Sequence, residues 1–250
     1  MLNKFKEYQL DLCEVENSSI QKISSKRFWY KHIKKNALKN DGDILEFGVY
    51  RGRSLLTAAL LLKQLGSKKK LYGFDSFKGF PSKTKFDDLK NFKNKKYFNK
   101  KFQNDYKKFI QLKKILNNKK KFTPFNIASS GDFSHSSKQH ILEKVKYLKL
   151  DNIVLIEGDF AKTVPNFFKS NKIKISSCNI DSDLYASYKI TLPYIYNYLS
   201  KNGYIFLDEY YSLKYPGAKI ATDKFCKQQK IKPKKHIVRP GEFERWYLTK

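Results

Sequence analysis

Short apolar runs of strand length alternate with helix-length segments along most of this 250-residue chain, and no other feature constrains its fold as strongly. Five runs are separated in this way, at residues 43–49, 71–75, 152–157, 173–180 and 204–207. Strands that alternate with helices form parallel βαβ units. Two more runs, 236–239 and 243–248, flank Pro240-Gly241 and predict a terminal β-hairpin. The alternation predicts an α/β fold with a seven-stranded, mostly parallel sheet and helices on both faces.

We interpret the chain as a single domain whose core spans residues 42–81 and 131–250. Residues 1–41 predict a helical extension at the N-terminus. Residues 82–130 are dense in Lys, Asn and Phe without strand periodicity, which indicates an insertion with one or two helices, suited to form a lid. The helices expected within the core span residues 51–65, 134–148, 162–169, 185–199 and 218–229.

The formal net charge of +29 is unusually high. A strongly basic chain suggests nucleic acid, an anionic membrane surface or an acidic small molecule as partner. A genome rich in A and T also accounts for it, because Lys, Asn, Phe, Ile and Tyr are abundant together and share A/T-rich codons. Since no RNA-binding module or base-methylating loop is recognisable, nucleic acid is disfavoured as a partner.

The cysteines and the apolar runs bound the environment of the protein. Cys13, Cys178 and Cys226 are isolated, which argues against a disulfide framework or a structural zinc site and fits a reducing cytosol. The longest apolar run, residues 55–62, is far shorter than the ~20 residues that span a bilayer. Residues 1–12 mix charged and apolar positions, unlike a signal peptide. We therefore expect a cytoplasmic protein without a membrane span.

Acidic residues follow two of the predicted strands. Asp181 and Asp183 come after the run 173–180, and Asp208-Glu209 come after the run 204–207. Because ligands of an open α/β sheet bind outside the carboxyl ends of its strands, these clusters are expected to face one another. Neighbouring carboxylates repel unless a cation lies between them, and hard oxygen ligands suit Mg²⁺ or Ca²⁺. The pattern favours a metal-assisted enzyme over a simple binding module.

A glycine-containing turn follows the first strand, from Glu46 to Ser54, and includes Gly48 and Gly52. Such a turn lets the backbone approach a ligand and offers the N–H groups of the next helix to an anion. The turn matches neither G-x-G-x-x-G nor the Gly-Lys-Ser/Thr of a phosphate-binding loop, which disfavours nucleoside triphosphate hydrolysis. The alternative is that these glycines serve only packing.

Two further acids end strands on the same side. Asp75, after the second strand, is placed to accept hydrogen bonds from a ribose diol, and Asp159, after the third, is placed to reach an adenine amino group. Each acid is equally explained as a turn or capping residue when it is taken alone. Together with Asp181 and Asp208 they are much harder to explain as caps.

Five segments carry a specific resemblance to a known family. They are residues 46–54 (EFGVYRGRS), 73–81 (GFDSFKGFP), 158–165 (GDFAKTVP), 180–185 (IDSDLY) and 203–210 (GYIFLDEY). In order and spacing they resemble the macrocin O-methyltransferase (TylF) family, from about residue 42 onward. The resemblance implies the class I, Rossmann-like methyltransferase fold, with S-adenosyl-L-methionine and Mg²⁺ as cofactors. It also implies methylation of sugar hydroxyls, notably on antibiotic glycosides.

The resemblance assigns roles by position in this sequence. Metal ligation falls to Asp181, Asp208 and Glu209, although the family usually has Asp-Asp where this chain has Asp208-Glu209. The residues that it implies for cofactor binding are Glu46, Gly48 and Gly52 at the methionine part, Asp75 at the ribose, Asp159 near the adenine, and Ser54 and Ser76 beside them.

The catalytic base is the least defined role. Family members use a histidine upstream of the region that matches residues 131–133, but residues 122–130 contain none. His135 and His140 are the nearby candidate bases, whereas His32 and His236 have weaker claims. The predicted catalytic residues are His135 and Asp181. Asp183 stays open between metal ligand, substrate contact and cap of the helix that begins at Tyr185, and capping is the favoured interpretation.

The acceptor also stays open. A sugar or glycoside hydroxyl is expected, and Arg51, Arg53 and Lys78 would suit an anionic small molecule or glycan. A small phenol or catechol is the alternative within enzymes. An RNA methyltransferase or RNA-binding protein is suggested only by charge, and a degenerate methyltransferase fold that acts as a scaffold only by the missing histidine. The oligomeric state stays open as well, although family members commonly self-associate and a homo-oligomer is one of the alternatives.

Overall fold

A seven-stranded sheet forms the centre of the molecule, in the order β3-β2-β1-β4-β5-β7-β6. The structure is a computed structural model that describes residues 24–117 and 121–250. β3, β2, β1, β4 and β5 run parallel, whereas β7 runs antiparallel to β5 and to β6. The strands are β1 (Asp43–Phe47), β2 (Leu71–Asp75), β3 (Ile153–Glu157), β4 (Ile175–Ile180), β5 (Leu199–Leu207), β6 (Lys234–Lys235) and β7 (Trp246–Thr249). The predicted fold class is confirmed.

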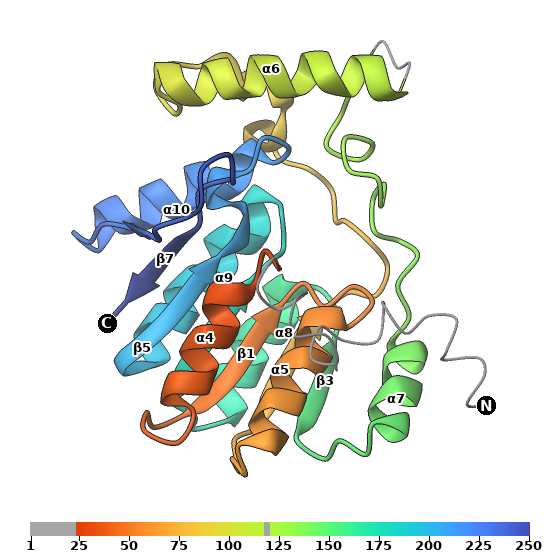
Figure 1. Cartoon of the computed structure of the whole chain (residues 1–250), viewed down its shortest axis with the longest axis vertical. Helices are drawn as coiled ribbons and strands as arrows, with labels where there is room; N and C mark the ends of the chain where they lie inside the picture. Colours follow the sequence, from red (N-terminus) through yellow and green to blue (C-terminus); the bar gives the residue numbers. More distant parts are fainter. Residues whose placement is uncertain (1–23, 118–120) are drawn as a thin grey trace.

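Helices cover both faces of this sheet (Figure 1). One face carries α4 (Arg27–Asn36), α5 (Arg53–Gln64) and α7 (Lys138–Tyr147), and the other carries α8 (Phe160–Ser170), α9 (Tyr185–Tyr198) and α10 (Pro216–Gln228). Successive side chains of a strand point to opposite faces. Accordingly Ile44 packs in the core under α4 and α5, whereas Leu45 packs in the core under α8 and α9. All of β4 is buried, as is typical of a central parallel strand.

Helix α5 illustrates how the sequence builds one of these layers. Leu55, Leu56 and Leu62 are completely buried, and each contributes about 1.5–3 kcal/mol relative to an exposed side chain. The helix ends at a left-handed Gly66, after which Ser67 N donates to Leu62 O at 2.9 Å. Anchoring of α5 against the sheet fixes its N-terminus at the carboxyl end of β1.

Several boundaries differ from the sequence prediction. Helix α7 begins at Lys138 instead of near residue 134, because Ser137 rather than Ser134 accepts from a backbone N–H of its first turn. Strand β5 begins at Leu199, where it pairs with Ile175 across a register irregularity. Strand β6 is only Lys234–Lys235, and the predicted run 236–239 continues as a loop in which Ile237 is 96% exposed.

Residues 82–130 contain two 3-10 helices, η1 (Lys85–Asp87) and η2 (Leu89–Lys93), and the helix α6 (Lys100–Asn117). Figure 1 shows α6 at the top, beyond the carboxyl ends of the strands. Its inner side chains Phe102 and Tyr106 stack on Phe92 of η2, and this aromatic cluster is almost fully buried. Aromatic packing therefore joins the pieces of the segment that showed no strand periodicity.

Asp87 connects this segment to the core. Its Oδ1 accepts from the N–H of Tyr185, the first residue of α9, at 2.7 Å, and its Oδ2 accepts from Thr84 N at 2.7 Å. Asp87 is 1% exposed. The favoured interpretation that Asp183 caps α9 is therefore wrong, because a buried carboxylate from elsewhere in the chain occupies that position.

The cysteines and the helices bear on the expected environment of the protein. Cys178 and Cys226 are free and buried, whereas Cys13 and the rest of residues 1–23 lie outside the described residues. Among the helices that the structure describes, none combines the length and the apolar character needed to cross a membrane.

Candidate active site

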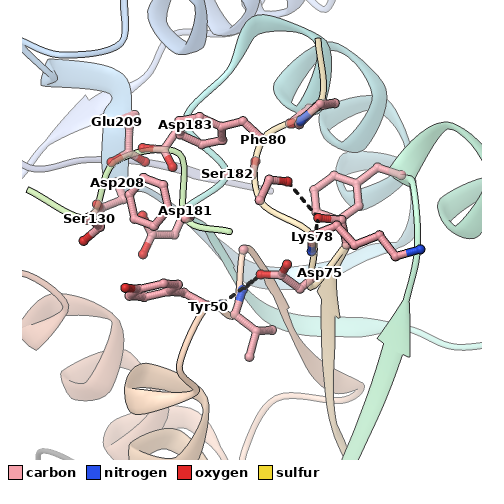
Figure 2. Close-up of a pocket in the computed structure, with 18 of the residues that line it drawn as sticks. Tyr50, Asp75, Lys78, Phe80, Ser130, Asp181, Ser182, Asp183, Asp208 and Glu209 are labelled. Atoms are coloured by element: carbon pink, nitrogen blue, oxygen red, sulfur yellow. Dashed lines mark hydrogen bonds between the residues drawn. The ribbon is translucent and has the colours of Figure 1, made fainter. Parts of the chain in front are cut away.

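The carboxyl ends of the parallel strands open into a cavity of ≈ 830 Å³. On one side lie the turn after β1 and the end of β2, and on the other lie acidic side chains from the ends of β4 and β5. Figure 2 shows Asp181, Asp183, Asp208 and Glu209 gathered on one side and Asp75 on the other. The inserted segment also contributes lining residues, namely Ser82, Ala128, Ser129 and Ser130.

Gly48 lets the two sides approach each other. Its φ of +88° is in the left-handed region, and a Cβ atom there would overlap the backbone oxygen of Asp181. The N–H of Asp181 in turn donates to Phe47 O at 2.8 Å. The glycine turn and the acidic cluster are therefore directly joined through backbone.

Asp75 organises the turn that it faces. Its Oδ2 accepts from the N–H groups of Val49 and Tyr50, both at 2.8 Å, and its Oδ1 accepts from Phe77 N at 2.8 Å. Ser76 Oγ donates to the next turn, at Gly79 O. Charged acceptors of several backbone N–H groups hold a loop in one conformation, so Asp75 shapes the cavity wall as well as lining it.

Glu46 lies beneath the cavity and is 0% exposed. Its Oε1 accepts from Ser54 Oγ at 2.6 Å and from Asn179 Nδ2 at 2.7 Å. Burial raises the pKa of Glu46 to about 8, although these two hydrogen bonds act in the opposite direction. Glu46 thus braces β1, β4 and the start of α5 from below.

The residues predicted to bind a cofactor divide into two groups. Those that line the cavity are Gly48, Ser54, Asp75, Ser76 and Asp159. Glu46 and Gly52 are buried outside the lining, and Gly52 packs against Ile141 of α7. Asp159 also caps α8, since it accepts from Ala161 N at 2.9 Å. Both alternatives weighed for Asp159 are therefore compatible with its position.

The predicted metal carboxylates lie together. Ligand oxygens of Asp181, Asp208 and Glu209 are all within 4.8 Å of one another. Burial and then the Asp208 charge raise the pKa of Asp181 to about 6. Burial and the neighbouring charges also hold the pKa values of Asp183 and Glu209 well above their ordinary range. The cluster is thus short of positive charge.

A cation that the sequence did not identify lies in this cluster. Lys26 Nζ is 2.6 Å from Asp181 Oδ2 and 2.8 Å from Asp208 Oδ1. Burial alone would lower the pKa of Lys26, but the two carboxylates outweigh it and raise the pKa far above its ordinary value. Lys26 is thus a permanent cation. In a chain with 52 Lys and Arg residues, no local signal distinguishes it.

The predicted histidine base lies elsewhere. His135 is exposed, in the loop before α7, and is outside the lining of the cavity. His32 and His236 both pack against Tyr204 on the α4 side of the sheet. Of the two predicted catalytic residues, Asp181 lines the cavity and His135 does not.

The sheet order, the glycine turn and the cavity at the strand ends define a class I, Rossmann-like methyltransferase. The chain belongs to the macrocin O-methyltransferase (TylF) family, whose model matches residues 25–125 and 130–243. It is an O-methyltransferase, and the family resemblance seen in the sequence is confirmed.

Solved structures agree with this assignment. CalS11, a calicheamicin methyltransferase, is 25% identical with a TM-score of 0.64, over 90% of this chain and 77% of that chain. The O-methyltransferase NovP shares the fold at 18% identity and a TM-score of 0.59, over 91% of this chain and 79% of that chain. None of the curated proteins compared with the chain matches it.

Proposed function

We propose that this O-methyltransferase transfers the methyl group of S-adenosyl-L-methionine to a hydroxyl group of a sugar or glycoside. The observation that carries the proposal is the cavity in which a glycine turn faces a cluster of carboxylates. A second structure of CalS11, 25% identical with a TM-score of 0.53, is described as a TDP-rhamnose 3'-O-methyltransferase. A sugar hydroxyl is therefore the acceptor that the family supports best.

The cofactor is proposed to bind along the turn after β1. Gly48 presents bare backbone to the cavity, and Asp75 and Asp159 line it farther along. A carboxylate oxygen has more than one lone pair, so Asp75 can hold the turn and still accept from ribose hydroxyls. This placement would direct the sulfonium methyl towards the acidic cluster.

Basic residues favour an acceptor that carries negative charge. Arg51, Arg53, Lys78 and Lys214 all line the cavity. Cations that surround a cavity attract anionic groups, and guanidinium groups match phosphate oxygens in geometry. A sugar nucleotide has both required parts, a diphosphate and a sugar hydroxyl. We therefore propose a nucleotide-linked sugar as the first acceptor to test.

The acidic cluster fits the Mg²⁺ ion that the family resemblance implied. Its oxygens are hard ligands within 4.8 Å of one another, and Glu209 Oε2 is buried without a hydrogen-bond partner among the described residues. Asp181, Asp208 and Glu209 would hold the ion. When bound, such an ion lowers the pKa of a coordinated hydroxyl and orients it.

The chain's own contribution to the transfer is to hold the acceptor and take its proton. The acceptor oxygen forms a bond to the methyl carbon as the carbon–sulfur bond breaks, which leaves S-adenosylhomocysteine. The hydroxyl proton passes to a carboxylate oxygen of Asp181. Asp181 suits this role because its side chain lines the cavity and is 27% exposed.

Release of S-adenosylhomocysteine from panels of nucleotide sugars and of catechols tests the proposal. Methylation of a nucleotide sugar is expected, and a preference for catechols would establish the alternative acceptor. Asp181→Asn should lower kcat at least about 100-fold and leave cofactor affinity, measured by calorimetry, within about two-fold. Asp151→Asn, at an exposed position, is the matched control. Full activity in excess EDTA would rule out the metal.

A further inference from the structure

The position of Lys26 is built into the fold. Its N–H donates to Ser24 Oγ at 3.1 Å, and its carbonyl accepts from Tyr30 N at 3.1 Å in the first turn of α4. Three residues later Trp29 is completely buried and donates from Nε1 to Ser177 Oγ of β4 at 2.9 Å. β4, which leads directly into Asp181, thus also anchors the helix that follows Lys26.

The ammonium group of Lys26 lies where a divalent ion would be. A Mg²⁺ ion needs oxygen ligands at about 2.0–2.1 Å. Lys26 Nζ already contacts one oxygen of each carboxylate, Asp181 Oδ2 at 2.6 Å and Asp208 Oδ1 at 2.8 Å. A metal ion bound to the same two carboxylates would lie only a few ångströms from the ammonium in a poorly solvated place, where like charges repel strongly. The two occupants are therefore mutually exclusive.

The four carboxylates at this end of the sheet share few cations. Lys26 contacts Asp181 and Asp208, while the charges of Lys214 and Arg245 lower the pKa values of Asp183 and Asp208. Glu209 is 6% exposed, and its Oε2 has no hydrogen-bond partner in the described part of the chain. A buried oxygen without a partner is costly, and a doubly charged ion would satisfy more of these groups than Lys26 does.

We infer that Lys26 is a built-in counter-ion that competes with the divalent metal for Asp181 and Asp208. This inference rests on the metal site of the proposed function. Metal binding then requires the ammonium to leave the two carboxylates, and Lys26 sets the metal affinity of the free enzyme. Because Lys26 itself lines the cavity, its side chain has open space to move into.

Binding of Mn²⁺, followed by the paramagnetic resonance signal of the free ion, tests the inference without substrate or cofactor. Lys26→Met should bind Mn²⁺ at least about ten-fold tighter than the wild type, the factor that one buried charged contact provides. Lys35→Met is the matched control, since it removes the same charge from an exposed position on α4, and its affinity should equal that of the wild type.

The outcomes separate the two claims. Equal affinity of the wild type and Lys26→Met would overturn the role of Lys26 and leave the metal site standing. Absence of Mn²⁺ binding in both proteins would overturn both claims. Binding of Mn²⁺ by Lys26→Met but not by the wild type would support the role of Lys26, because the ammonium would then exclude the metal from the wild-type site.

A measurement on the wild type covers the case in which Lys26→Met fails to fold. Acylation of lysine amines, read by mass spectrometry, should leave Lys26 protected in the absence of metal. Saturating Mn²⁺ should increase its modification at least about ten-fold, as expected when a local equilibrium shifts towards an exposed state. Continued protection while Mn²⁺ is bound would refute the inference.

Discussion

Replacement of Glu46 by Gln should change how the stability of the protein depends on pH. Glu46 is fully buried, and burial raises its pKa from 4.5 to about 8. A carboxyl whose pKa is raised by folding contributes its full stability below pH 4.5, and this contribution is lost as the pH rises towards 8. A shift of this size corresponds to a loss of about 5 kcal/mol of stability, of which about 4 kcal/mol falls between pH 5 and pH 9.

The side-chain amide of the Glu46→Gln variant would keep the acceptor oxygen for Ser54 and Asn179 but would not ionise. Urea unfolding at pH 5, 7 and 9 gives the free energy of unfolding of both proteins. Between pH 5 and pH 9 the wild type should lose about 4 kcal/mol relative to Glu46→Gln. Glu143→Gln, at an exposed position on α7, is the control and should follow the wild type within about 0.5 kcal/mol. Parallel curves for the wild type and Glu46→Gln would refute the reasoning.

Two further predictions concern the backbone around the cavity. Asp87→Ala should lower the free energy of unfolding by about 2–4 kcal/mol, because the first amide of α9 loses its buried cap. Asp88→Ala is the control, since it removes an exposed cap of η2, and it should lower the free energy of unfolding by at most about 1 kcal/mol. Gly48→Ala should lower the free energy of unfolding by more than about 3 kcal/mol, because its Cβ would overlap Asp181 O at a positive φ. Gly66→Ala is the control, since Gly66 has a positive φ but open space around it, and it should lower the free energy of unfolding by only about 1 kcal/mol. Urea unfolding measures the free energy of unfolding of all four variants. Equal losses for Asp87→Ala and Asp88→Ala would contradict the capping role of Asp87, and equal losses for Gly48→Ala and Gly66→Ala would contradict the close approach at Gly48.

Asp87 also gives the inserted segment a direct influence on the site. The loop that leads into α9 contains Ser182 and Asp183, which line the cavity, and Asp87 holds the first amide of the helix that follows. The same segment contributes Ser130 to the lining. Changes in residues 82–130 are therefore expected to alter the acceptor side of the cavity even where they do not line it.

The sequence by itself determined the fold class, the family and which strand ends carry acids. Alternating apolar runs specify strand and helix periods locally, and parallel strands place their carboxyl ends at one edge of the sheet. For this reason Asp75, Asp159, Asp181 and Asp208 could be assigned to one cavity from their positions in the chain. Glu46 was recognised from the same motif, although its burial beneath the cavity was not foreseen.

Only the tertiary structure decided which side chains meet those acids. Lys26 reaches Asp181 and Asp208 because α4 docks on β4, and Asp87 rather than Asp183 caps α9 because the inserted segment folds back on the core. His135 is at the surface for a similar reason, since the loop before α7 directs it away from the cavity. Contacts between residues far apart in the chain leave no mark in local periodicity, so among so many lysines the one that compensates the carboxylates becomes identifiable only after folding.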